Sequence, residues 1–330
     1  YEAFHKFISF HVAEHTNPNA RPTRADALNF VKFMLGHGLS LKTITTAMSQ
    51  IAGEKTSPGD RKWRRALVLD WMLWDVFANT WSSRRPKFAT FFANSTAFLQ
   101  HRYWRHMEPD AYQVKPSDRE MADFGDAVED SYRHMDAIVG KAFDLVGPRG
   151  RIVLATALSQ EANTRYEHIG GKFVYRPHSF KDLFAWAGGP QPTSFEPVMT
   201  HQAWASFASE DAAIEAEATL DALQSNGKTI MEWRRTGNRV MFWCGLISRT
   251  EPGFELTHAK TGKSIAFDDL FMLVGQVNNS QHCRDGAFWV QSRDGSSRVH
   301  AEKLPLEHAY GIMMDMFDDA PQAGAQVAAE

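Results

Sequence analysis

Apolar residues recur at helical spacing through the beginning of the chain. Between Arg24 and Leu35 they fall at i, i+3, i+4 and i+7, and Gly36 and Gly38 end the pattern. The same spacing predicts helices over 39–51 and 61–80, the latter rich in Trp and Leu. We therefore predict a helical section over residues 1–82, which caps the rest of the molecule or is inserted into it.

The pattern then changes to that of a strand, a long helix and a second strand. The run Phe88–Ala93 is typical of a buried strand, 124–146 of a helix closed by Gly147-Pro148, and 151–156 of a short apolar strand. Continuous apolar strands are typical of a parallel sheet covered on both faces, and such a connection is right-handed. The sequence predicts an α/β fold, an α/β/α sandwich around a mostly parallel sheet.

The rest of the sequence also predicts a mixture of helices and strands. It predicts a strand and a helix over 171–186, a helix over 210–223, strands over 229–233, 240–247, 268–274 and 287–291, and a helix over 306–317. Gly237-Asn238 marks the turn between the first two of these strands. We expect residues 83–318 to form one α/β core and residues 319–330 to be a flexible tail.

The net charge and the cysteine content limit the classes of partner and the cellular compartment that we expect for this protein. The formal net charge is −3, which gives no reason to expect nucleic acid or an acidic membrane as partner. The two cysteines stand apart from any C-x-x-C spacing, so a reducing, cytoplasmic setting is expected. No apolar run reaches the ~18 residues of a membrane span. Because Tyr1 falls inside an amphipathic pattern, we expect a preceding segment, a partner chain or a homo-oligomer to complete the molecule.

The stretch after the strand at Phe88–Ala93 is the best candidate for a pocket, because parallel strands deliver polar side chains at their carboxyl ends. We predict catalytic roles for His101, Ser95, Thr96 and Gln160, and substrate-binding roles for Asn94, Arg102 and Arg105. Two structural alternatives stay open. His101 can be a histidine hydrogen-bonded at a strand-to-helix turn, and Ser95 and Thr96 can cap the helix that follows.

Three landmarks within residues 69–317 share their order and spacing with a known family. They are the segment from Pro86 to Tyr103, the run Tyr132-x-x-x-Asp136-x-x-x-Gly140 before the strand at 151–156, and His282-Cys-Arg-Asp-Gly286. In these landmarks the chain resembles the phosphodiesterase and nucleotide-pyrophosphatase branch of the alkaline-phosphatase superfamily. The resemblance implies an α/β/α fold and hydrolysis at two divalent metals, usually zinc.

The chain departs from that family at the metal ligands. Asn94 stands where the family has an Asp, Phe98 where it has a His, and the neutral run 156–160 replaces an Asp-His pair. His282 remains as a metal ligand, with Asp285 beside it, so we expect one divalent metal (Zn or Mn) and not two. The predicted function is a divergent hydrolase or transferase acting on a phosphate or sulfate ester or a related anionic small molecule. A non-catalytic binding or partner subunit is the alternative.

Two other motifs suggest different functions. His11-x-x-Glu14-His15 matches the H-x-x-E-H pattern of an inverted zinc peptidase, although Pro18 follows closely and no third ligand is evident. The run 61–65 and the run 102–106 interleave cations with aromatic residues, as nucleic-acid sites do. A small phosphate-bearing ligand near Arg102 and Arg105 fits the acidic chain better than nucleic acid does.

Overall fold

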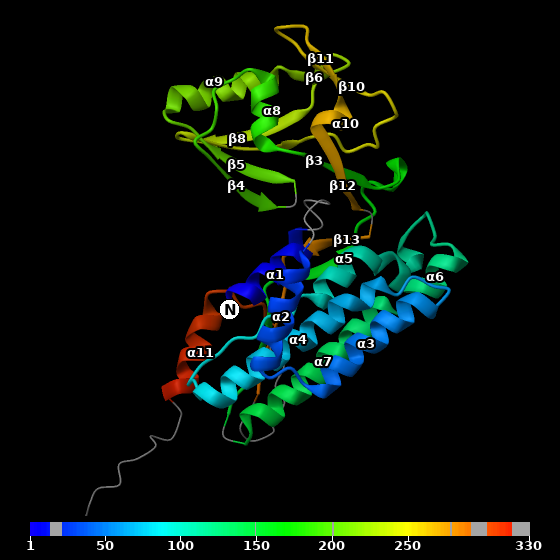
Figure 1. Cartoon of the computed structure of the whole chain (residues 1–330), viewed down its shortest axis with the longest axis vertical. Helices are drawn as coiled ribbons and strands as arrows, with labels where there is room; N and C mark the ends of the chain where they lie inside the picture. Colours follow the sequence, from blue (N-terminus) through cyan, green and yellow to red (C-terminus); the bar gives the residue numbers. More distant parts are fainter. Residues whose placement is uncertain (14–21, 149, 200, 278, 292–301, 319–330) are drawn as a thin grey trace, which may run out of the picture. The chain divides into compact units, whose positions relative to one another are not determined.

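The computed structural model describes residues 1–13, 22–148, 150–199, 201–277, 279–291 and 302–318. The chain divides into two compact units, each built from separate segments (Figure 1). Unit 1 joins residues 1–44, 109–115 and 163–279, and unit 2 joins residues 45–108, 116–162 and 280–330.

Unit 1 is built on antiparallel sheets. Its first four-stranded sheet has the order β4 (Ser194–Met199), β5 (Gln202–Ser206), β9 (Arg239–Cys244), β8 (Met231–Thr236). Its second has the order β11 (Ser264–Ala266), β10 (Glu255–His258), β6 (Leu223–Ser225), β7 (Lys228–Thr229). A third pairing joins β12 (Phe271–Val277) to β3 (Lys172–Pro177). The predicted hairpin turn is confirmed, with Gly237 at a φ of 57° between β8 and β9.

Helices cover these sheets and complete the core of unit 1. They are α8 (Phe180–Ala187), α9 (Glu210–Asp221) and the short α10 (Phe267–Leu270), together with the 3-10 turns η2 (Pro109–Ala111) and η3 (Glu167–Ile169). Ser179 and Ser209 cap α8 and α9 by accepting a backbone N–H in the first turn. Leu183 of α8, Leu220 of α9 and Phe242 of β9 are fully buried in one core cluster, so helix and sheet stabilise each other.

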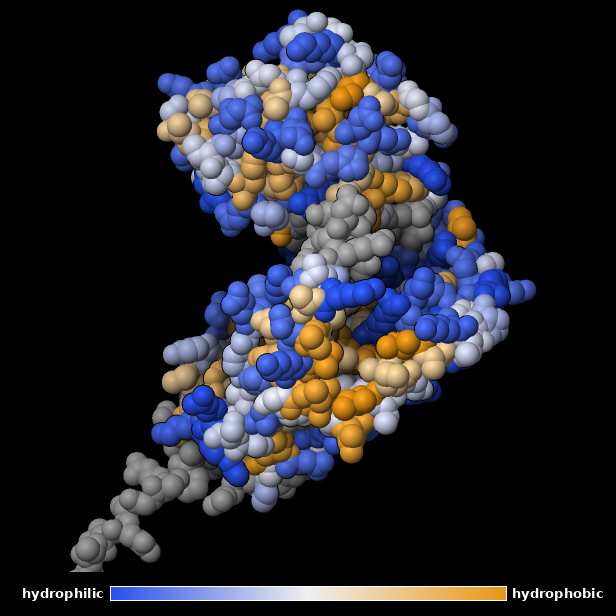
Figure 2. Space-filling view, in the orientation of Figure 1, coloured by the Kyte–Doolittle hydropathy of each residue, from blue (hydrophilic) through white to orange (hydrophobic). Residues whose placement is uncertain are grey.

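The helices α1 (Glu2–Ala13) and α2 (Arg24–Gly36) pack on each other through aromatic rings. Phe7 stacks on Phe30 with ring centroids 3.9 Å apart. Thr23 and Asp26 form a capping box at the start of α2. The outer stripe of α2 is apolar and exposed at Leu28, Val31 and Leu35, and Figure 2 shows apolar side chains over this helix.

Unit 2 is mainly helical. Its helices are α3 (Leu41–Thr56, which begins in unit 1), η1 (Lys62–Arg64), α4 (Arg65–Arg84), α5 (Ser95–Met107), α6 (Asp118–Phe124), α7 (Ala127–Val146) and α11 (His308–Asp318). Two antiparallel pairs accompany them: β1 (Val153–Thr156) with β14 (Ala287–Val290), and β2 (Ser159–Ala162) with β13 (Ser280–Cys283). Helix α5 packs against α7 on one side and against β2 and β13 on another, which positions the site described below (Figure 1).

The predicted α/β/α sandwich around a parallel sheet is wrong. Every strand pairing among the described residues is antiparallel, in sheets of two to four strands. The strand at 151–156 exists as β1, but its last two residues are exposed and its partner β14 runs antiparallel to it. Two covered faces, which a parallel sheet needs, are therefore not present at β1.

The run Phe88–Ala93 is not a strand, and the expected strand–helix–strand unit has no first strand. Phe91 packs its ring on Trp74 and Phe77 of α4, whereas Phe92 is 78% exposed. Aromatic packing of Phe91 on a helix, and not backbone pairing, attaches this segment to the fold.

The helices predicted over 24–35, 210–223 and 306–317 are confirmed as α2, α9 and α11. The predicted domain boundary near residue 82 stays a prediction, and the predicted tail 319–330 lies outside the described residues. Among the described helices, none combines the length and apolar character that a membrane span requires.

Candidate functional site

One face of the β2–β13 pair carries the central polar side chains of unit 2. His282 of β13 lies opposite Gln160 of β2, and Ser280 lies opposite Ala162. Because side chains alternate across a strand, His282, Ser280 and Gln160 share a face. The other face has its own contacts: Ser159 Oγ lies 2.8 Å from Cys283 Sγ, and Gln281 donates to Glu161 at 2.8 Å.

Helix α5 brings His101 onto the first of these faces. His101 Nε2 lies 3.2 Å from His282 Nε2, and the two rings meet at 88°. The Gln160 amide nitrogen lies 3.1 Å from His101 Nε2 and 3.1 Å from His282 Nδ1. Three of the predicted site residues, His101, Gln160 and His282, are therefore in direct contact; together with Ser280 we call them the imidazole pair site.

Ser280 connects this site to the body of unit 2. Its Oγ lies 3.0 Å from Gln160 Oε1 and 3.1 Å from the Gln100 carbonyl, and it can donate to either acceptor. Gln100 in turn donates to the Tyr132 hydroxyl of α7 at 2.7 Å. Gln160 and Ser280 are buried, so these bonds fix the amide beside the two rings.

The environments of the two imidazoles differ. Burial lowers the pKa of His101, and the nearby His282 lowers it further when charged. His282 is exposed, so solutes reach the pair from its side. At a distance of 3.2 Å between the ring nitrogens, a positive charge on one imidazole disfavours a second positive charge on the other.

Asn94, Ser95 and Thr96 lie at the N-terminus of α5 in other surroundings. Thr96 Oγ1 donates to the Ser131 carbonyl of α7 at 3.4 Å. Ser95 is buried beside Asp70 of α4, whose pKa is raised by burial and lowered in smaller part by the backbone N–H groups of Ser95 and Asn94. Neither Ser95 nor Thr96 caps α5. The acidic side chain at this helix end is Asp70.

The remaining predicted residues make contacts of their own. The Arg102 guanidinium stacks on Phe98 at 4.8 Å, and Arg105 pairs with Glu120 of α6 at 3.5 Å. Asp285 pairs with Lys303, and its carbonyl accepts from Ser159. In the described part of the chain, no three His, Cys, Asp or Glu side chains gather as a metal-ligand group, so Asp285 does not join His282 and His101 in one.

Glu14 and His15 of the H-x-x-E-H pattern lie outside the described residues. Sequence reasoning missed Ser280, whose signal is its position two residues before His282 on an alternating strand. It also missed the buried pair Asp70 and His134, whose Oδ2 and Nε2 atoms lie 3.7 Å apart between α4 and α7. Both are isolated polar residues within helical patterns, so nothing local distinguishes them from surface positions.

No protein-family model matches the chain, and comparison with curated proteins and with solved structures finds no match. The resemblance to the alkaline-phosphatase superfamily therefore stays a prediction, and functional inference rests on the imidazole pair site itself.

Proposed function

We propose that the imidazole pair site binds one divalent cation and hydrolyses a phosphate or sulfate ester or a related small anionic ester. The observation that carries this proposal is the 3.2 Å between the Nε2 atoms of His101 and His282. Two nitrogens bound to one tetrahedral zinc at about 2.0–2.1 Å lie about 3.3 Å apart. The distance between the two Nε2 atoms thus suits a shared cation.

The other ring nitrogen of His101 supports the same proposal. A metal-binding histidine donates its second ring N–H to an acceptor, and Ser280 Oγ lies 3.5 Å from His101 Nδ1. At His282 the neighbour of Nδ1 is the Gln160 amide nitrogen, at 3.1 Å, which is a donor and gives no such support. The Gln160 amide, 3.1 Å from His101 Nε2, is the third polar group close to the shared position.

The donor set supports zinc or manganese in a single position and not the two-metal arrangement of the family that the sequence resembles. His101 and His282 are two strong ligands, and the described residues add no third His, Cys, Asp or Glu to them. Open positions are left for water and substrate, as in catalytic sites. When bound, a divalent cation there would polarise an ester oxygen and lower the pKa of bound water.

The chain's own residues would bind and orient the ester. Gln160 is held by Ser280 with its amide nitrogen facing both rings, and an N–H group released when an imidazole binds the cation would donate to an anionic oxygen that reaches the pair. His282 is exposed, so an ester can approach without opening the fold. The lowered pKa of His101 keeps that ring neutral and able to bind a cation near neutral pH.

We also propose that this activity is cytoplasmic. Cys244 and Cys283 are free thiols, and Cys244 is buried, which agrees with a reducing compartment.

The proposal is tested by hydrolysis assays with p-nitrophenyl phosphate, bis(p-nitrophenyl) phosphate and p-nitrophenyl sulfate, with zinc or manganese added. We expect turnover of at least one ester, reduced about a hundredfold or more in His101→Ala and in His282→Ala. His308→Ala, an exposed histidine of α11, is the matched control and should keep full activity. No turnover of any ester, or equal turnover in all four proteins, would contradict the proposal.

A further inference from the structure

Unit 2 contains a cavity of about 510 Å³ between α3, α4 and α7, separate from the imidazole pair site. This volume lies within the range of small-molecule sites, about 300–1,000 Å³. Helix α3 contributes Thr45, Thr46, Ser49 and Gln50, and Trp71 and His134 line it from α4 and α7. The cavity is therefore lined by hydroxyls, an amide and an imidazole, together with an apolar part formed by Leu67, Val68 and Trp71.

Arg61 and Arg64 give this cavity a positive wall, and no carboxylate is among its lining residues. Arg64 is fixed: it donates to Asp130 at 2.9 Å and stacks on Trp63 at 4.7 Å, while its Nε is buried and has no hydrogen-bond partner in the described structure. The exposed Arg61 guanidinium has no hydrogen bond or ion pair to any residue that the structure describes. Of the two positive charges, one is left without a counter-charge.

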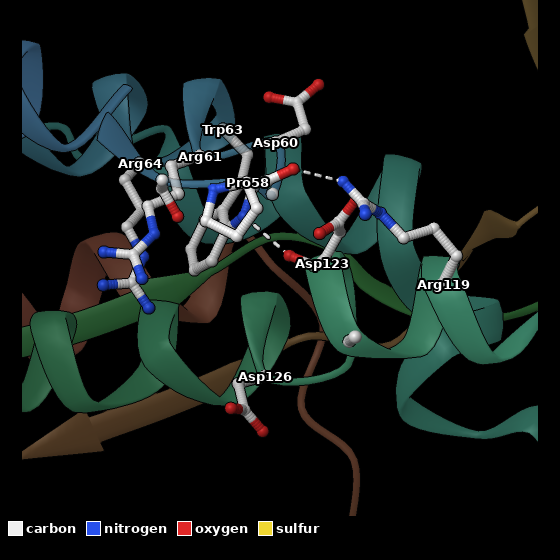
Figure 3. A pocket seen from close by; sticks show the side chains of 11 residues that line it. Pro58, Asp60, Arg61, Trp63, Arg64, Arg119, Asp123 and Asp126 are labelled. Atoms are coloured by element: carbon white, nitrogen blue, oxygen red, sulfur yellow. Dashed lines mark hydrogen bonds and ion pairs between the residues drawn. The ribbon is translucent and has the colours of Figure 1, made fainter. Parts of the chain in front are cut away.

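A second cavity, of about 410 Å³, shares two lining residues with the first (Figure 3). It shares Arg61 and Arg64, which lie side by side, but it also contains Asp60, Asp123 and Asp126. Its third arginine, Arg119, is already bound to the Pro58 carbonyl and to Asp123. An anion in this cavity would lie close to three carboxylates, whereas the lining of the larger cavity has none, so an anion is favoured in the larger cavity.

The larger cavity is also held in shape before any ligand binds. Gln50 of α3 donates to the Arg61 carbonyl at 2.7 Å and to Glu54 at 2.9 Å. Glu54 in turn accepts from Arg65 of α4 at 2.6 Å. These bonds tie α3 to the start of α4, so the two walls keep their separation and ordering on binding is limited to side chains such as Arg61.

We propose that this cavity binds a phosphorylated polyol. Arg61 and Arg64 would bind the phosphate, since paired guanidinium groups suit a phosphate's oxygens. The hydroxyls of Thr45, Thr46 and Ser49 would meet the polyol hydroxyls, and Trp71 would contact its carbon skeleton. This site does not depend on the imidazole pair site or on its proposed activity.

Isothermal titration calorimetry with glycerol 3-phosphate tests the proposal, with glycerol as the neutral probe. We expect glycerol 3-phosphate to bind and glycerol not to bind. Arg61→Gln should weaken binding about tenfold or more, because it removes a charge-assisted contact. Lys62→Gln removes the same charge one residue away, from a side chain that does not line the cavity, and should leave the affinity unchanged.

A second comparison separates this cavity from the imidazole pair site. Binding that persists in His282→Ala and weakens in Arg61→Gln supports the proposal. No binding at about 10 mM probe, equal affinity in the wild type and Arg61→Gln, or loss of binding in His282→Ala would each overturn it. Thermal unfolding of each variant verifies that it is folded.

Discussion

His101 and His282 place their Nε2 atoms 3.2 Å apart, although 181 positions separate them in the chain. The contact depends on two independent features: α5 packs on β2 and β13, and the register of those strands sets His282 opposite Gln160. Neither histidine alone could bind a cation in the proposed way. Their proximity is the property from which the proposed cation binding follows.

The first prediction concerns the proton equilibrium of this pair. A charged His282 disfavours a second charge on His101, so replacing it in His282→Ala should raise the pKa of His101. The rise should be partial, because burial, the larger cause, remains. Titration of the imidazole C–H signals by NMR measures it, with His308→Ala as control. An unchanged pKa of His101 would show that the rings do not interact in solution.

A second prediction concerns pH and the buried His134. Burial lowers the pKa of His134 to about 4, below the ordinary value of 6.5. As pH falls below 6.5, the unfolded chain binds this proton before the folded chain does, so the stability that His134 contributes is lost between pH 6.5 and about 4. Between about pH 7 and about pH 4.5, the wild type should lose on the order of 2 kcal/mol more than His134→Gln.

Urea unfolding of both proteins at the two pH values measures this difference. The comparison between variants is needed because Asp70, which faces His134, has a raised pKa and acts in the opposite direction. Equal losses in the two proteins would mean that His134 is protonated as easily in the folded as in the unfolded chain.

Two positions of the same helix test the core of unit 1. Leu220 of α9 is fully buried, whereas Ile214 is 47% exposed. Leu220→Ala should reduce the free energy of unfolding by about 2–5 kcal/mol, and Ile214→Ala by about 1 kcal/mol or less. Chemical denaturation followed by tryptophan fluorescence compares them. Similar losses at both positions would mean that α9 is packed through a different face.

The fold and the candidate site differed in how far the sequence could predict them. The helices were predictable because burial against one neighbour imposes the 3.6-residue period, as in α2 and α9. The direction of the strands was not predictable, because an apolar run such as 151–156 has no residue that specifies whether its partner strand runs parallel or antiparallel. The aromatic run at 88–93 has strand composition but packs on α4, a choice set by tertiary contacts.

Within the site, His101 and Gln160 were predictable as polar residues that follow short apolar runs, whereas His282 was predicted from the landmark His282-Cys-Arg-Asp-Gly286. His101 follows Asn94, Ser95 and Thr96 on the same segment, but the helical turn directs Ser95 toward Asp70 and Thr96 toward α7. A helix separates residues six positions apart by more than one turn, so closeness in sequence did not mean a common pocket. The Asp285 carboxylate forms an ion pair with Lys303, and no local sequence pattern predicts this pair.

The antiparallel register of β2 and β13 can be tested by a cross-link. Ser159 and Cys283 are paired residues whose Oγ and Sγ atoms lie 2.8 Å apart, so Ser159→Cys should form a disulfide with Cys283 on mild oxidation. Cys244 should not compete, because burial raises its pKa to about 12. Mass spectrometry of unreduced peptides detects the link. A Glu161→Cys variant, two residues along β2 and paired with Gln281, should not cross-link, and efficient linkage there would contradict the register.

The most direct test of the account is the zinc content of the purified protein after equilibrium dialysis against zinc, measured by plasma mass spectrometry. We predict about one zinc per chain in the wild type and in His308→Ala, and loss of this zinc in His101→Ala and in His282→Ala. Zinc retained equally in all four proteins, or bound by none of them, would contradict the proposal that His101 and His282 share a cation.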